Sequence, residues 1–203
     1  MNPFFARLFG AGRFALLAVL LGVTLAGCGV NNIPTQEEAA KAKWSQVLNQ
    51  YQRRADLIPN LVETVKGYAK QEAQVLEAVV AARARATSVQ VPADIVTNPD
   101  AFKKFQEAQS QLSASLGRLL AISENYPDLK SNQNFLALQS QLEGTENRIA
   151  VARRDYIEAV QAYNTELRTF PGMIWANTLY KSNKPMETFT IAEETKRPPQ
   201  VKF

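Results

Sequence analysis

Apolar residues recur at alternating steps of three and four along most of the chain between residues 35 and 170, which is the spacing of one face of an α-helix. The first pattern continues across Pro59 to Ala86 and predicts a single helix of about 50 residues, about 75 Å long. Thr35 and Glu38 have the spacing of a capping box and predict its start. Pro59 should bend or loosen this helix, because proline lacks a backbone donor.

Two further long helices follow from the same periodicity. Asn98 and Pro99 predict the start of one helix, which should end at Tyr126, the residue before a proline. The next should run from about residue 132 to 169, and a short helix fits residues 171–180. The fold class is therefore all-α, an elongated antiparallel bundle of three long helices over residues 35–180, with room for a short fourth helix.

The two ends of the chain lack helical periodicity of this kind. Residues 181–203 should form an extended C-terminal tail, whose apolar end at Val201 and Phe203 either docks on the bundle or is offered to a partner. At the other end, the only charges before Cys28 are Arg7 and Arg13, and residues 14–25 form an apolar run too short to span a bilayer comfortably.

The apolar run ends in Leu25-Ala-Gly-Cys28, which resembles a bacterial lipoprotein signal. This resemblance implies a signal peptide at residues 1–27, lipid attachment to Cys28 and a short tether at residues 28–34. An uncleaved membrane anchor is the alternative. Gly29 after the cysteine, where aspartate would indicate retention at the inner membrane, favours the outer membrane if the host has two.

A polar stripe crosses the helix around Pro59. We call it the outer stripe, and its members are Arg53, Asp56, Asn60 and Glu63. It is either a solvated face with local ion pairs or a contact surface for another protein. Ile58 and Val62 lie on the opposite stripe and should be core. Glu72 is the one carboxylate on the predicted seam, either a buried acid or partner contact, or a residue paired across the bundle.

The net charge and the scarcity of histidine and cysteine exclude several classes of partner and site. The chain has 23 basic and 19 acidic residues, and removing residues 1–27 takes away two arginines and no acids, which leaves a net charge of +2. This balance predicts no nucleic-acid partner. With no histidine and a single cysteine, we expect no metal site, no disulfide and no cofactor. Carboxylate pairs at helical spacings remain, Asp56 with Glu63 and Glu143 with Glu146.

Many residues, in order, resemble the LemA family of bacterial envelope proteins over roughly residues 42–203. They include Arg54, Asp56 to Val62, Gly67, Tyr68, Glu72, Arg83, Glu124 to Lys130, Phe135, Thr145 to Asn147, Ile149, Arg153, Tyr156, Tyr163, Asn164, Phe170, Pro171 and Pro199 to Phe203. Gln71 and Ile157 depart from the family pattern, where histidine and asparagine are common. The resemblance implies a helical fold and an envelope location, and it implies no agreed reaction.

Together these observations predict a non-enzymatic, membrane-anchored interaction or scaffold lipoprotein of the bacterial cell envelope. Its partners would be the membrane, through lipid on Cys28, and an envelope protein at the outer stripe; no small-molecule substrate is indicated. Two alternatives remain, an envelope enzyme that uses carboxylates alone and a helical protein that shapes membranes.

Overall fold

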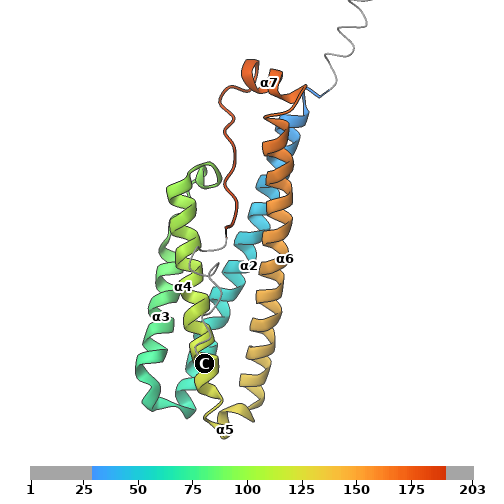
Figure 1. The fold of residues 1–203 in the computed structure, drawn as a ribbon. Coiled ribbons are helices and arrows are strands. Elements are labelled where there is room, and N and C mark those ends of the chain that lie inside the picture. The colour runs from blue at the N-terminus through green and yellow to red at the C-terminus, as the bar shows by residue number, and fades with distance from the viewer. Residues whose placement is uncertain (1–28, 191–203) are drawn as a thin grey trace, which may run out of the picture.

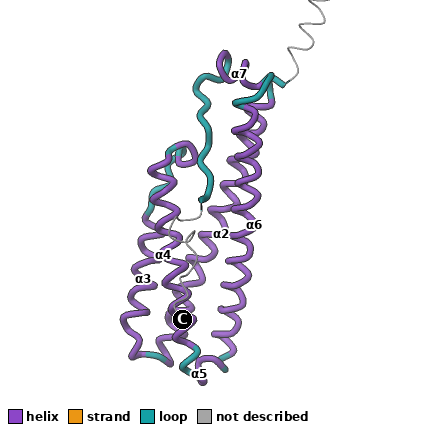
Figure 2. The backbone as a smooth tube through the Cα atoms, in the orientation of Figure 1, coloured by secondary structure: helices purple, strands orange, loops and turns teal. Residues whose placement is uncertain are grey.

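A computed structural model describes residues 29–190, which form a bundle of α-helices (Figures 1 and 2). This confirms the all-α fold class. The long helices are α2 (Asn32–Tyr68), α3 (Ala73–Ser88), α4 (Pro99–Ser123) and α6 (Gln133–Glu166). The short elements are the 3-10 turns η1 (Lys70–Glu72) and η2 (Ile95–Thr97) and the helices α5 (Pro127–Lys130) and α7 (Gly172–Thr178). Cys28, Val201 and Phe203 lie outside the described residues, so the predictions made for them stay predictions.

The single helix predicted from residue 35 to 86 is wrong, and with it the arrangement of three long helices. The chain leaves the helical conformation at Ala69 (φ −127°, ψ 54°), and α3 turns back to pack against α2 and α4. Each of the four long helices runs opposite to the next along the chain (Figure 1). The apolar spacing continues across the turn because α3 buries Leu76 and Val79 in the same core as α2. Periodicity alone therefore does not distinguish a continuous helix from a helical hairpin.

The predicted helix starts differ in accuracy. α2 begins at Asn32, and the Thr35 hydroxyl donates to the carbonyl of Asn31 at 2.7 Å, so the capping box at Thr35 is wrong. Asn98 and Asn132 do cap α4 and α6, each accepting a backbone N–H three residues later, at 3.2 and 3.0 Å. The predicted short helix is α7.

Helix α2 continues through Pro59. A proline at this position leaves the carbonyl of Ala55 without its usual intrahelical donor. The Arg83 Nε of α3 donates to that carbonyl at 2.8 Å. The neighbouring helix therefore supplies the hydrogen bond that proline removes.

The core consists of two clusters of buried side chains. An aromatic cluster lies towards the end where α2 begins and contains Trp44, Tyr51, Phe102, Phe105, Tyr156 and Phe189. An aliphatic cluster fills the half near α5 and contains, among others, Ile58, Leu61, Val65, Leu116 and Leu119. Ile58 and Val62 are buried, as predicted.

Residues 181–190 extend along the bundle after α7 (Figure 1). The Glu187 N–H donates to the carbonyl of Val96 at 2.7 Å, and the Tyr156 hydroxyl donates to the carbonyl of Glu187 at 2.8 Å. Met186 and Phe189 are buried in the aromatic cluster. This part of the predicted tail is extended, and it is docked on the bundle.

Candidate functional site

All four side chains of the outer stripe are exposed on α2. The contacts they make are local: Asp56 accepts a hydrogen bond from Gln52 Nε2 at 2.8 Å, and Glu63 lies 3.6 Å from the Lys66 ammonium. The adjacent Arg54, in contrast, is buried. The sequence therefore placed the stripe on the correct face of the helix.

A groove of about 610 Å³ lies between α2 and α3 next to the outer stripe. Its apolar lining includes Val62, Leu76 and Val80, and its charged lining consists of Glu63, Lys66, Lys70 and Glu77. Glu63 belongs to both the stripe and the groove. The groove therefore meets the outer stripe at Glu63.

Arg54 is the centre of a buried polar layer that we did not predict. Its guanidinium donates to Gln109 Oε1 at 2.6 Å, to Ser113 Oγ at 2.7 Å and to Glu146 Oε1 at 3.0 Å, which joins α2 to α4 and α6. The guanidinium also lies 5.0 Å from the centre of the Tyr51 ring. Burial raises the pKa of Tyr51, against the opposing effect of the nearby Arg153 and Arg54 charges. The signal in the sequence was the polar Gln109, which stands among apolar residues in the seam of α4.

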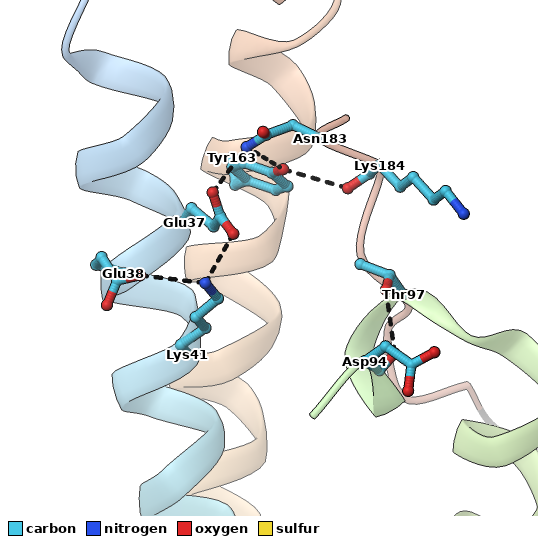
Figure 3. A network of polar contacts seen from close by, with 8 residues as sticks. All are labelled: Glu37, Glu38, Lys41, Asp94, Thr97, Tyr163, Asn183 and Lys184. Carbon is cyan, nitrogen blue, oxygen red and sulfur yellow. Dashed lines mark hydrogen bonds and ion pairs between the residues drawn. The ribbon is translucent and has the colours of Figure 1, made fainter. Parts of the chain in front are cut away.

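A second polar network joins the start of α2 to the C-terminal segment (Figure 3). Asn183 Nδ2 donates to Glu37 Oε2 at 2.7 Å, and Lys41 Nζ lies 2.7 Å from Glu37 Oε1. Hydrogen bonds to Glu37 and Glu38 raise the pKa of Lys41. The Tyr163 hydroxyl donates to the carbonyl of Lys184 at 3.2 Å, and burial raises the pKa of this tyrosine.

All of these residues except Glu38 line a hollow of about 580 Å³, together with residues near η2 such as Asp94 and Thr97. The Thr97 hydroxyl donates to the carbonyl of Asp94 at 3.0 Å (Figure 3). Asn183 and Lys184 pair with Glu37 of α2 and Tyr163 of α6, whereas the contacts of Lys41 and of Thr97 are local. The network therefore holds residues 183 and 184 against α2 and α6.

The carboxylates considered for catalysis do not act together, because each contacts a different partner. Glu143 accepts a hydrogen bond from Gln139 at 3.0 Å, whereas Glu146 pairs with Arg54. Glu72 lies in η1 and accepts a hydrogen bond from the Tyr126 hydroxyl at 2.9 Å, so it is paired across the bundle at its end, away from the predicted seam. Between residues 29 and 190 no group of three or more Cys, Asp or Glu side chains is placed to hold a metal ion.

The model of the LemA family matches residues 43–203. The chain belongs to the LemA family. Relatives of this LemA chain include magnetosome protein MamQ 2 of Paramagnetospirillum magneticum, 26% identical over 157 residues, or 70% of this chain and 58% of the relative. Magnetosome protein MamQ of Magnetospirillum gryphiswaldense is 25% identical and covers 77% of this chain and 64% of its own. Protein LemA of Metamycoplasma hominis is 27% identical over 62% of this chain and 51% of its own.

This LemA chain therefore spans between 51% and 64% of the length of these curated relatives. Within residues 29–190 no helix is long and apolar enough to cross a bilayer. The two positions that depart from the family pattern differ in environment: Gln71 is exposed in η1, and Ile157 is half-buried against the aromatic cluster.

Several residues that carry the LemA resemblance meet each other or the backbone across elements. Arg54 pairs with Glu146, Arg83 reaches the α2 carbonyl that Pro59 leaves free, and Glu72 pairs with Tyr126. Asn164 exchanges two hydrogen bonds of 2.9 Å with the backbone of Met186. Packing and hydrogen bonding account for these residues. Asp56 and Asn60 belong to the same block but lie on the exposed face of α2.

Proposed function

We propose that this LemA family chain is a non-enzymatic, membrane-anchored interaction protein of the bacterial cell envelope, held by lipid on Cys28, which contacts an envelope protein through the outer stripe. The observation that carries the proposal is the contrast within one stretch of α2. Arg54 and Ile58 are held in the core, while Asp56 and Asn60 of the same family block are exposed on a helix whose orientation is fixed. At an exposed helix position, stable packing requires only that the residue be polar. A contact surface would explain why Asp56 and Asn60 in particular match the LemA family pattern.

The groove beside the outer stripe favours a helical partner. An amphipathic helix buries its apolar face in such a groove and presents charged residues at the edges. Val80 is exposed and provides apolar contact above the buried Val62 and Leu76, and the charges of Glu63 and Lys70 provide specificity at the rim. We therefore propose that the partner contributes an amphipathic helix.

The proposed anchor is supported by the sequence before the bundle. The apolar run at residues 14–25 and the motif ending in Cys28 fit a lipoprotein signal, and α2 begins four residues after Cys28. Two or more acyl chains give firm membrane binding, whereas one gives only marginal binding. Gly29 favours the outer membrane in a host with two membranes.

The test is in-cell crosslinking of the full chain with Asp56 and Asn60 both changed to alanine. The matched control changes Glu107 and Gln111 to alanine, since these are also an exposed acid and amide one helical turn apart, on α4. We expect the stripe variant to lose crosslinked protein partners at an unchanged melting temperature, and the control to keep them. The same partners in both variants would show that the stripe is a solvated face.

A further inference from the structure

Four large apolar side chains are exposed at one end of the molecule, around α7. Phe170 is 78% exposed and Leu179 64%, and Met173 and Ile174 are exposed as well. We call these four residues the apolar tip. Exposed apolar groups gathered in one place mark a contact with a partner or a membrane, whereas single ones are ordinary.

The fold dictates that these side chains point outward. α7 packs against α2, and its Trp175 and Ala176 pack on the aromatic cluster, so Met173 and Ile174 face away from it. Gly172 allows α7 to lie close to the end of α6, because a Cβ at this position would collide with the backbone oxygen of Glu166. The contacts of α7 with α2 and α6 thus place the tip outside the core.

α2 begins at this same end of the bundle, next to α7 (Figure 1). Gly29 lies beside Pro171, and Asn32 Nδ2 donates to Glu166 Oε1 at 3.2 Å. α2 begins at Asn32 and not at Thr35, so the link after Cys28 is only residues 29–31. A link of three residues reaches about 10 Å. Lipid on Cys28 would therefore hold this end of the bundle against the bilayer.

The charges next to the tip suit a membrane surface. Arg168 and Lys181 are both exposed and line one hollow of about 380 Å³ beside α7. Of the nearby carboxylates, Glu37 is paired with Lys41 and Asn183, and Glu166 accepts from Asn32. Apolar residues with flanking cations are the composition of segments that lie in the interface of an anionic bilayer.

We propose that the apolar tip inserts into the interfacial layer of the lipid bilayer, with Arg168 and Lys181 against anionic headgroups. The inference rests on the proposed membrane anchoring. It adds a second point of attachment, which turns a lipid tether into a fixed orientation with α2 directed away from the membrane.

The test places a photo-crosslinking amino acid in the full chain, at Ile174 in one variant and at Leu136 in the other. The two positions have similar exposure, 46% and 42%, but Leu136 lies near the opposite end of α6. Each variant is purified from membranes and reconstituted into vesicles of phosphatidylglycerol and phosphatidylethanolamine. We expect lipid adducts at residue 174 and none at residue 136.

A chain that stays in the membrane fraction but gives no lipid adduct at residue 174 would overturn the tip proposal and leave the anchor intact. Adducts at residue 174 to a second copy of the chain would also overturn it. A chain absent from the membrane fraction of cells would instead contradict the proposed anchoring itself. As a second readout, Phe170→Ser with Ile174→Ser should keep the chain in the membrane fraction and make residues 168–181 accessible to protease on vesicles.

Discussion

Among single residues, Arg54 has the environment that most constrains the fold. It is 1% exposed, and its ion-pair partner Glu146 is 41% exposed. Its Nε is buried without a hydrogen-bond partner, so the guanidinium depends on the groups that Nη1 and Nη2 reach. A buried charge that loses its partner is costly, because the remaining charge stays out of water.

We therefore predict that Glu146→Gln lowers the free energy of unfolding by about 2–3 kcal/mol, less than for a fully buried pair because water screens Glu146. The control is Glu143→Gln on the same helix, which is exposed and should change stability by no more than about 0.5 kcal/mol. Denaturant unfolding of both variants measures the difference. Equal losses in the two variants would mean that Glu146 does not stabilise the Arg54 charge.

Between helices, the contact of Arg83 with Ala55 explains how α2 tolerates an internal proline. We predict that Arg83→Ala lowers the free energy of unfolding by about 1–3 kcal/mol, since it leaves a carbonyl of α2 unsatisfied. In a Pro59→Ala background the same change should cost less, because residue 59 then has a backbone N–H that reaches the carbonyl of Ala55. A double-mutant cycle measures this coupling. Costs that simply add would show that Arg83 acts independently of Pro59.

Much of the helical structure was predictable because its determinants are local. Asn98 and Asn132 cap helices through bonds to residues three positions on, and the seams of α4 and α6 follow from spacing alone. The hairpin between α2 and α3 was not predictable, because the apolar spacing continues through it. What fixes the turn there lies far away in sequence: Tyr126 bonds Glu72, and Asn132 Nδ2 donates to the Tyr68 hydroxyl at 2.8 Å.

The candidate contact surface also has one part that follows from local sequence and another that depends on tertiary contacts. The exposure of Asp56 and Asn60 follows from their position on one helix, so the sequence predicts it. The groove requires α3 to fold back beside α2, and the apolar tip requires α7 to dock with Trp175 inward. Both depend on tertiary contacts that the spacing of residues along one helix does not contain.

End to end, the bundle suits a protein that stands on a membrane. α2 has 37 residues and is about 55 Å long, and it starts at the end that carries the apolar tip. Asp56 lies 24 residues after the start of α2, so the outer stripe is about 35 Å along it. With the proposed lipid anchor on Cys28, a partner that meets the stripe would do so well above the headgroups.

Only residues 29–31 separate Cys28 from α2, so the proposed lipid anchor is the feature on which this arrangement depends. We predict that Cys28→Ala abolishes incorporation of a fatty-acid probe in cells, because the thiol is the only one in the chain. The variant should also keep the leader and run at a larger size, because the motif that ends in Cys28 is lost. Asn31→Ala, three residues away in the link, should label and mature like the unchanged chain. Labelling of the alanine variant at the mature size would show that Cys28 is not the lipidated residue and would overturn the proposed anchor.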